Sequence, residues 1–521
     1  MRALLALICA LCLVSCSPEG STRPSDARAS QLQDLSQLRK YVSLDAAYSA
    51  AQRALASQAI SESEAGAGKW TAADFELQVA RVVALADNGH STAWSGPRSG
   101  RLNRIPARFL LLADGVFVVR AKGPGVSLLG MRVDAIDGIS TADILRRLRI
   151  YRGGPDNLRD NDSVGLVESP QLLHAAGIAQ SDHEVTLTVS DHDHPRNLQL
   201  SALPPAPDEP RVQPLRYMAA PRVMNEDAEW QSAFQSTPAP LWLQEPNLAF
   251  RLEPLAALRA VYLQLKVNTN AADGERIGAF LARARRSIAE GRPQNVILDM
   301  RFNGGGDYTK TAAFMSDLPK LIPAEGRIFV ITHVTTFSAG ISSVGFVKQA
   351  GPRQVIIVGE PIGDRLIFYG EPRDFTLPNS GIGMSYATGL HDYLHGCRWF
   401  GPCYWVNWLY PISVPTLEPD LSAPLSFALI AAGRDPAMEA ISLALQNPSR
   451  SGHPGSSVYS MTKAAVAVMA KGIAVDLAGR GITVNNIQPG PTITDMTVER
   501  AAAVRLSADA GIAHRGRISV R

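Results

Sequence analysis

The most constraining feature of this sequence is the alternation of apolar stretches with helix-like segments between residues 260 and 360. Continuous apolar stretches predict buried strands at 260–268, 295–302, 327–332 and 354–360. The segments between them predict helices at 272–291, 308–321 and 338–350. Strands that are apolar at nearly every position and are joined by helices are typical of a parallel sheet covered on both faces. We therefore expect an α/β fold in this part of the chain.

Three of these strands end in unusual loops, FNGGGD at 302–307, TTFSAG at 335–340 and GEPIGDR at 359–365. Functional groups gather at the carboxyl ends of strands in such sheets, so we expect the loops to lie together. The glycines at 304–306 allow positive φ and let the backbone approach a ligand closely. The motif lacks the Gly-Lys-Ser/Thr of a P-loop. A simple tight turn is the alternative interpretation.

The serine of the second loop, Ser338, begins a predicted helix. Capping of backbone N–H groups is the commonest reason for a serine there. The same position lies at the positive end of the helix dipole, which stabilises a developing oxyanion. Together with the preceding glycine run, the N–H of Ala339 could form an oxyanion hole. We interpret Ser338 as a candidate nucleophile, with capping as the alternative.

These segments carry a family resemblance. VILDMRFNGGG, TTFSAG and VIIVGEPIGDR, in this order, resemble the carboxyl-terminal processing (tail-specific) protease family, and LADNGHSTAW resembles its D-G-H-T element. The match covers about residues 75–440. The resemblance implies a ClpP/crotonase-like α/β fold and serine peptidase chemistry on polypeptides. It also implies that Ser338 is the nucleophile and that Gly304, Gly305 and Ala339 are oxyanion-hole elements.

The sequence departs from that family at the general base. Where tail-specific members carry a lysine, this chain carries Asp364 and Arg365, and arginine stays protonated and cannot accept the proton. The relatives of that family include the tricorn core protease, and the tricorn-like branch uses a histidine as base. His90 is the matching candidate in this sequence. A structural, hydrogen-bonded histidine is the alternative. Asp364, Glu371 or Glu360 could orient the imidazole, and the sequence does not choose among them.

The N-terminus predicts export. A basic start and a short apolar run, ALLALICALCLV, form a leader that is too short to span a bilayer. Its end, LVSC, resembles the bacterial lipoprotein signal, which implies a lipid on Cys16. We therefore expect residues 1–16 to be the signal and residues 17–30 the tether. The protein would be lipid-anchored in the cell envelope, facing the periplasm or in the outer membrane.

The cysteines outside the leader predict a disulfide. Besides Cys16 and two cysteines in the leader, only Cys397 and Cys403 are present. An even pair in an exported protein is typical of a disulfide. A metal site with His391 and His395 is the weaker interpretation, because the spacing does not match a usual ligand set. We expect no metal.

The region before the sheet divides into two segments. Residues 31–107 predict a small helical unit, and residues 108–205 predict short strands. Gly130 and Gly138 in the second segment belong to a pattern that resembles a PDZ-like module, although many folds share such turn glycines. A Pro-rich linker follows, and residues 215–447 form the predicted peptidase domain.

The last segment, residues 449–521, changes character. Residues 455–496 resemble the short-chain dehydrogenase/reductase family, and Tyr459 and Lys463 match its Y-x-x-x-K pair. No glycine-rich dinucleotide loop precedes this pair, and about 70 residues are too few for a nucleotide-binding sheet. We interpret the segment as a truncated fragment and expect no cofactor.

Three functional hypotheses follow. The first is an envelope lipoprotein that cleaves polypeptides through Ser338, with His90 as base. The second is a non-catalytic binding or scaffold protein on the same fold, suggested by the missing lysine. The third is an NAD(P)-dependent oxidoreductase that acts through Tyr459 and Lys463. The net charge of +3, without a basic run interleaved with aromatics, gives no reason to expect a nucleic-acid partner.

Overall fold

The structure is a computed structural model. It describes residues 26–93, 100–191, 194–207, 217–218, 229–234, 239–272 and 274–446. The chain forms two compact units, Met1–Ile441 and Ser442–Arg521. The described part of the second unit is the end of one helix, so the fold described below is that of the first unit.

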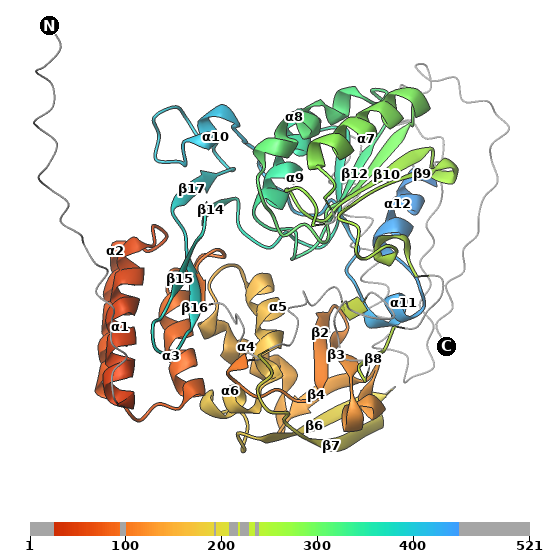
Figure 1. Cartoon of the computed structure of the whole chain (residues 1–521). Helices are drawn as coiled ribbons and strands as arrows, with labels where there is room; N and C mark the ends of the chain where they lie inside the picture. Colours follow the sequence, from red (N-terminus) through yellow and green to blue (C-terminus); the bar gives the residue numbers. More distant parts are fainter. Residues whose placement is uncertain are drawn as a thin grey trace, which may run out of the picture. The chain divides into compact units, whose positions relative to one another are not determined.

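Three helices begin the described chain, α1 (Ala27–Leu44), α2 (Ala50–Ala65) and α3 (Ala72–Ala84) (Figure 1). Each starts after a polar residue, Asp26, Ser49 or Thr71, whose side chain accepts a hydrogen bond from the third helical amide. Such a cap stabilises a helix by about 1 kcal/mol. Local sequence signals therefore set all three starting points.

The helical unit packs against strands that come nearly 300 residues later in the chain. A small sheet orders β1 (Thr92–Ala93), β16 (Gly383–Tyr386) and β15 (Arg373–Thr376). Leu377 and Met384 belong to the same buried cluster as Leu38 and Phe75 of the helices. Tyr41 Oη also donates to the Ser385 carbonyl at 2.7 Å. The helices thus share their core with the C-terminal half of the first unit.

The predicted region of short strands is an antiparallel sheet. Its main path is β2 (Ala107–Leu112), β3 (Gly115–Ala121), β4 (Arg132–Ile136), β6 (Glu184–Asp191) and β7 (His194–Ser201). β5 (Ile139–Ser140) pairs with β4, and β8 (Gln231–Ser232) pairs with β3. The helices of this region are α4 (Thr141–Leu148), α5 (Asp156–Val167) and α6 (Pro170–Ala175). Gly130 and Gly138 both have positive φ, as turns require.

The predicted parallel sheet is present. Its order is β18 (Leu421–Ser422), β13 (Val355–Gly359), β12 (Ile328–Thr332), β11 (Asn295–Asp299), β10 (Ala260–Leu265) and β9 (Phe250–Leu255). The four predicted strands, β10 to β13, pair in parallel. The edge strands β9, which is antiparallel, and β18, which is parallel, are additions that the sequence did not predict.

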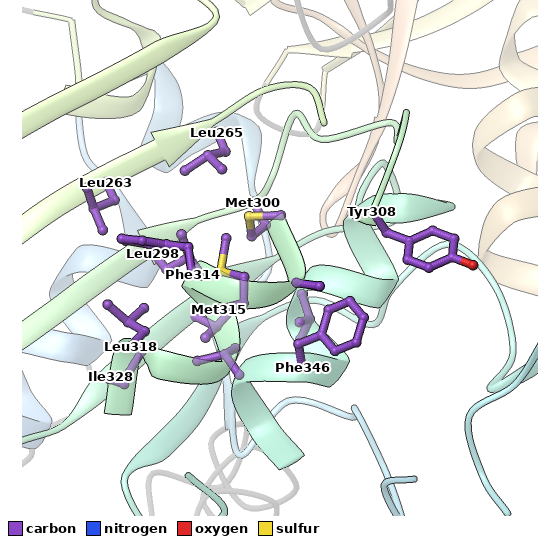
Figure 2. Packing of buried hydrophobic residues seen from close by; sticks show 14 of the residues in the cluster. Leu263, Leu265, Leu298, Met300, Tyr308, Phe314, Met315, Leu318, Ile328 and Phe346 are labelled. Carbon is purple, nitrogen blue, oxygen red and sulfur yellow. The ribbon is translucent and has the colours of Figure 1, made fainter. Parts of the chain in front are cut away.

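The predicted helices cover this sheet as α7 (Ile277–Gly291), α8 (Thr309–Asp317) and α9 (Ala339–Ala350). Alternate strand residues such as Leu263, Leu298 and Ile328 share one cluster with Phe314 and Met315 of α8 (Figure 2). The other alternate set, which includes Tyr262 and Ile297, is also buried. Each such apolar side chain contributes about 1.5–3 kcal/mol when it is fully buried. The continuous apolar pattern is thus explained by burial on both faces.

The remaining elements follow the sheet. They are β14 (Ile367–Gly370), β17 (Gly389–Asp392), α10 (Val406–Leu409), α11 (Phe427–Ala431) and α12 (Pro436–Gln446). Short 3-10 helices occur at Gly123–Leu128, Arg149–Tyr151, Leu241–Leu243, Ala256–Leu258 and Leu318–Lys320. Within the described ranges, every helix is too short or too polar to cross a bilayer.

Candidate active site

The three glycine- and serine-containing loops lie together because β11, β12 and β13 are neighbours in the sheet. Backbone hydrogen bonds join one loop to the next. The Phe337 amide donates to the Asn303 carbonyl at 2.9 Å, and the Gly363 amide donates to the Thr336 carbonyl at 3.0 Å. The site is therefore built at the carboxyl edge of the sheet.

Ser338 has a strained backbone at the strand-to-helix turn. Its φ is 52° and its ψ is −126°, and its side chain makes no capping hydrogen bond to α9. In contrast, the serines that precede α2, α4, α6 and α11 all accept such a bond. A non-glycine residue in this region costs on the order of 1–3 kcal/mol and persists only where the surroundings enforce it. The cap interpretation is therefore wrong, and Ser338 lies in a strained turn between β12 and α9.

Gly305 lies against Ser338 without room for a side chain. A Cβ at Gly305 would lie 2.7 Å from Ser338 Cβ, 3.1 Å from its Oγ and 3.2 Å from the Ala339 amide nitrogen. The φ of Gly305 is +115°, a conformation that side-chain-bearing residues rarely adopt. The second glycine of the run is therefore required both by its conformation and by the closeness of Ser338.

Two backbone amides of the predicted oxyanion hole differ in their hydrogen bonding. The Ala339 amide is the first of α9, so it has no partner within the helix. The Gly305 amide donates to Asn303 Oδ1 at 3.0 Å, so it is not a spare donor. Gly304 is exposed on the same loop. Because it has no side chain, Gly305 therefore lets the loop lie against Ser338. Gly304 and Ala339 are the candidate donors of hydrogen bonds to an oxyanion.

A buried amide network holds the glycine loop. Asn303 Nδ2 donates to Asn268 Oδ1 at 2.7 Å and to the Leu265 carbonyl at 3.1 Å. Asn268 Nδ2 in turn donates to the Ala339 carbonyl at 3.0 Å and to Ser343 Oγ at 2.8 Å. Because every one of these groups is paired inside the protein, the loop and the start of α9 are fixed relative to each other.

His90 lies beside this site, some 250 residues from Ser338 in the sequence. Its ring stacks on Phe337, the residue before Ser338, with centroids 4.4 Å apart, and on Phe368 at 5.3 Å. Its Nδ1 is 3.5 Å from Asp364 Oδ2, and both side chains are almost fully buried. The structure thus brings His90, Asp364 and the turn before Ser338 together, and among the three candidate acids it places Asp364 at the imidazole.

The imidazole of His90 has unused hydrogen-bonding capacity. Within the part of the chain that the structure describes, neither ring nitrogen has a hydrogen-bond partner, and neither does Asp364 Oδ2. His90 therefore makes no hydrogen bond to Ser338 in this state. Buried polar groups left unpaired cost about 1–3 kcal/mol each, so they call for a functional explanation.

Glu371 does not contact His90, which corrects the expectation that it belongs with the catalytic group. Its Oε1 lies 3.5 Å from His391 Nε2, and the His391 ring stacks on Phe368 at 4.8 Å. Phe368 therefore lies between the two histidines. Sequence reasoning considered His391 only as a metal ligand. The cross-strand register of β14 and β17, which pairs Phe368 with His391, is what brings it here.

Arg365, at the position where the sequence resemblance would place a lysine, binds the loop that carries His90. Its guanidinium donates to the Asp87 carbonyl at 2.8 Å, to the Asp87 carboxylate at 3.1 Å and to the Gly154 carbonyl at 3.3 Å. Asp87 also pairs with Arg159. Since Asp87 is three residues before His90, these contacts position the loop that carries the histidine.

The acids and histidines farther from Ser338 have other partners. Glu360 Oε1 accepts from the Leu425 amide at 2.7 Å, and its other oxygen lies 3.8 Å from His333 Nε2. His333 Nδ1 is 3.1 Å from Thr335 Oγ1. Glu360 and His333 therefore support the loop rather than join His90.

Burial lowers the pKa of both His333 and His391 below the ordinary value of 6.5. The folded chain then takes up these protons only at a lower pH than the unfolded chain does. Between the two pKa values the unfolded state binds more protons, so the free energy of unfolding falls as the pH drops below about 6.5. Urea unfolding at about pH 7.5 and about pH 5.5 measures this fall. We expect His333→Gln to reduce it, and an equal fall in the variant would contradict this assignment.

The other predicted sites are placed as follows. Cys397 and Cys403 form a disulfide with Cα atoms 5.8 Å apart. Across the described ranges, no group of three or more His, Cys, Asp or Glu side chains is arranged to hold a metal ion. Cys16, Tyr459 and Lys463 lie outside the described residues.

The fold is similar to that of a solved protein, CPAF. The chain is similar to mature CPAF complexed with lactacystin, with a TM-score of 0.53 and 12% identity over 82% of this chain and 99% of that one. A second mature CPAF structure gives a TM-score of 0.51 and 12% identity over 82% and 98%. The photosystem II D1 C-terminal processing protease gives 0.30 and 13% over 77% and 94%. At these identities, the likeness to CPAF is one of fold.

Sequence comparisons add one local match. The short chain dehydrogenase family model matches residues 447–505, which lie outside the described residues. No curated protein matches the chain. The similarity of the last segment to dehydrogenases, inferred above from Tyr459 and Lys463, is thus found independently over this range.

Proposed function

We propose that this chain is a serine peptidase that cleaves polypeptides through Ser338. The observation that carries the proposal is the backbone of Ser338, which is held at a φ of 52° in a strand-to-helix turn with no capping bond. A strained serine with an unengaged side chain at a helix N-terminus is suited to attack a carbonyl group. The CPAF-like fold and the motif order of the tail-specific family support the same chemistry.

In the proposed reaction, Ser338 Oγ attacks the scissile carbonyl and forms a tetrahedral intermediate. The proton of the hydroxyl passes to His90 Nε2, because Nδ1 faces Asp364. The amides of Ala339 and Gly304 donate to the oxyanion. His90 then gives its proton to the leaving amine as the C–N bond breaks. A water molecule hydrolyses the acyl-enzyme by the same steps, with His90 again as base.

His90 must approach Ser338 for this proton transfer. Hydrogen bonds of a catalytic group are often long or misaligned before substrate binds and shorten in the complex. The stacking of His90 between Phe337 and Phe368 allows the imidazole to slide within its plane while both faces stay covered. We propose that substrate binding completes the contact between His90 Nε2 and Ser338.

Hydrolysis of an unstructured polypeptide such as casein tests the function. The full chain is expected to release new amino termini, and His90→Gln to slow the release by about 10²–10⁴-fold, the usual contribution of a general base. His391→Gln is the matched control, because it also removes a buried imidazole that stacks on Phe368. An effect of His90→Gln no larger than that of His391→Gln would reject His90 as base.

A non-catalytic binding protein on the same fold is the second candidate. One observation favours it, namely that the Ser338 hydroxyl and the His90 imidazole are not hydrogen-bonded in the described structure. Such a protein would bind casein without cleaving it. The casein assay therefore separates the two candidates, since binding without new amino termini supports only the second.

We also propose that the chain is a cell-envelope lipoprotein anchored through Cys16. The leader-like first 16 residues, which end in LVSC, support the proposal. A lipid at Cys16 holds a protein at a membrane without a spanning helix. Flotation of the processed chain with vesicles measures the anchor, and its loss in Cys16→Ser is the expected result.

We propose that the antiparallel sheet of β2 to β8 is a PDZ-like module, supported by the turn conformations of Gly130 and Gly138. We propose that the tail, with Tyr459 and Lys463, is a reductase-derived fragment that binds no NAD(P), because the glycine-rich pyrophosphate loop is missing from the sequence.

A further inference from the structure

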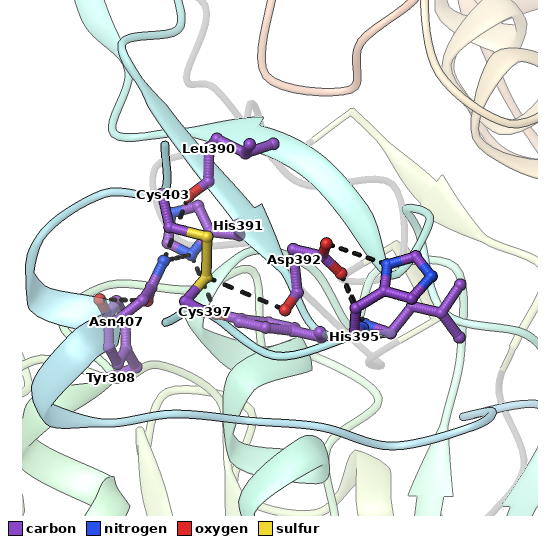
Figure 3. Close-up of a disulfide and its surroundings, with 10 residues drawn as sticks. Tyr308, Leu390, His391, Asp392, His395, Cys397, Cys403 and Asn407 are labelled. Atoms are coloured by element: carbon purple, nitrogen blue, oxygen red, sulfur yellow. Dashed lines mark hydrogen bonds and ion pairs between the residues drawn. A yellow bond between two sulfur atoms is a disulfide. The ribbon is translucent and has the colours of Figure 1, made fainter. Parts of the chain in front are cut away.

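A disulfide joins Cys397 and Cys403 (Figure 3). Exposed aromatic side chains lie in and just after the loop that it closes. Phe400 is 81% exposed, Trp399 is 59% exposed and Trp405 is 57% exposed. We call residues 397–409 the aromatic hairpin. Large apolar side chains gathered at a surface mark an interaction site rather than ordinary exposure.

The hairpin is held in this exposed form. Phe400 has a positive φ of 60°, which an aromatic residue adopts only when its surroundings enforce it. The rings of Trp399, Phe400 and Trp408 contact one another, with centroid distances of 5.4–5.7 Å. The disulfide and these ring contacts limit the conformations open to Trp399 and Phe400. The exposed aromatic surface is therefore pre-formed.

Hydrogen bonds attach the hairpin to the strand behind it. The Tyr404 amide donates to the Leu390 carbonyl of β17 at 2.9 Å. Asn407 Oδ1 accepts from Tyr308 Oη at 2.8 Å, and Asn407 Nδ2 lies 3.1 Å from His391 Nδ1. Figure 3 shows Leu390, His391, Tyr308 and Asn407 around the disulfide. The hairpin is thus attached to β17, which pairs with β14, the strand whose Phe368 stacks on His90.

The lack of acidic side chains around the aromatic hairpin favours a partner with a negatively charged surface. Residues 393–417 contain no aspartate or glutamate, and Arg398 lies between Cys397 and Trp399. Tryptophan is enriched where apolar chains meet lipid headgroups, because its ring is apolar and its N–H is polar. Arginine beside such rings can pair with lipid phosphates. This composition fits the surface of a phospholipid bilayer.

The N-terminus places a bilayer within reach. The proposed lipid site, Cys16, is ten residues before Asp26, which caps the first helix. Ten fully extended residues span at most about 35 Å. An anchored chain therefore stays close to the membrane surface, where a pre-formed aromatic loop can touch it at little further entropic cost.

We propose that the aromatic hairpin docks on a phospholipid bilayer. Trp399, Phe400 and Trp405 enter the headgroup region, and Arg398 contacts the phosphates. The proposal rests on anchoring at Cys16 for proximity and does not depend on the chemistry of Ser338. The hairpin and the anchor together give two membrane contacts, which fix the orientation of the protein as one lipid alone would not.

Brominated lipids test the docking. The full chain is floated with phosphatidylethanolamine–phosphatidylglycerol vesicles, and tryptophan emission is compared with and without bromine on the acyl chains. Bromine is expected to quench emission of the bound wild-type chain. A double variant that carries Trp399→Gln and Trp405→Gln is expected to lose at least half of this quenching. Leu55→Ser with Ile150→Ser is the control, since these residues are similarly exposed, at 53% and 55%, and lie elsewhere.

Flotation measures membrane binding through the anchor at Cys16, and bromine quenching measures contact of the hairpin with lipid. Flotation without bromine quenching would overturn the proposed docking and leave the anchor intact. Equal quenching in the wild-type chain and in the Trp399/Trp405 variant would also overturn it. The Trp399/Trp405 substitutions are also made in the Ser338→Ala chain, and casein binding is measured; a loss of binding would mean that the hairpin contacts a polypeptide. A loss of self-association in sedimentation would mean that it contacts a second copy of the chain. Either result would show that the membrane proposal is wrong.

Discussion

Replacing Ser338 by alanine is expected to reduce casein hydrolysis by at least about 10³-fold, as expected for loss of a serine nucleophile. The same change is expected to leave the free energy of unfolding nearly unchanged. The reason is that the Ser338 side chain makes no capping bond, so removing its hydroxyl costs no helix stability. Amino-terminus release and urea unfolding, measured on the same preparation, give the two quantities.

Ser426→Ala is the matched control for this substitution. Ser426 precedes α11 and its Oγ accepts from the Leu429 amide. Its loss is expected to destabilise the protein by about 1 kcal/mol and to leave hydrolysis intact. Ser338→Ala should therefore lower hydrolysis and not stability, whereas Ser426→Ala should lower stability and not hydrolysis. If Ser338→Ala destabilised the protein as Ser426→Ala does and left hydrolysis unchanged, Ser338 would be a structural residue.

Gly305→Ala is expected to lower casein hydrolysis by at least about 10²-fold, comparable to loss of oxyanion stabilisation. Its Cβ would lie 2.7 Å from Ser338 Cβ and 3.2 Å from the Ala339 amide nitrogen, so the nucleophile turn must shift. The φ of +115° adds strain to this steric overlap. Steady-state kinetics should show the loss mainly in kcat, because the catalytic geometry changes.

Gly138→Ala separates steric overlap from strain. Gly138 also has a positive φ, of +80°, but a Cβ there would meet nothing within 4 Å. This control is expected to cost about 1 kcal/mol of stability without changing hydrolysis. Equal activity losses in both glycine variants would show that general destabilisation, and not the contact with Ser338, causes the effect.

The sequence predicted the elements of the central sheet well because burial on both faces leaves a continuous apolar pattern. Each of the strands β10 to β13 overlaps a predicted strand. β18 was not predicted, since two residues carry no periodicity. The packing of Leu377 and Met384 against the N-terminal helices also could not be predicted, because nothing local links segments so far apart in the chain.

The candidate site was predicted in part. Motif order identified Ser338, His90 and the glycine run, and the structure brings them to one edge of the sheet. The choice of Asp364 over Glu371 depended on Phe368, which lies between the two histidines. That arrangement is set by the register of β14 with β17, and the chain between these two strands includes β15 and β16. The backbone strain at Ser338 is likewise visible only in the fold.

Labelling with a fluorophosphonate tests most directly whether Ser338 is a nucleophile, because the probe forms a covalent bond only with an activated hydroxyl. The full chain is treated with the probe and analysed by mass spectrometry after digestion. An activated serine predicts a single adduct, on the peptide that contains Ser338, which is absent from Ser338→Ala and reduced in His90→Gln. An unlabelled Ser338 in folded protein, or an adduct that persists in Ser338→Ala, would contradict the proposed peptidase chemistry.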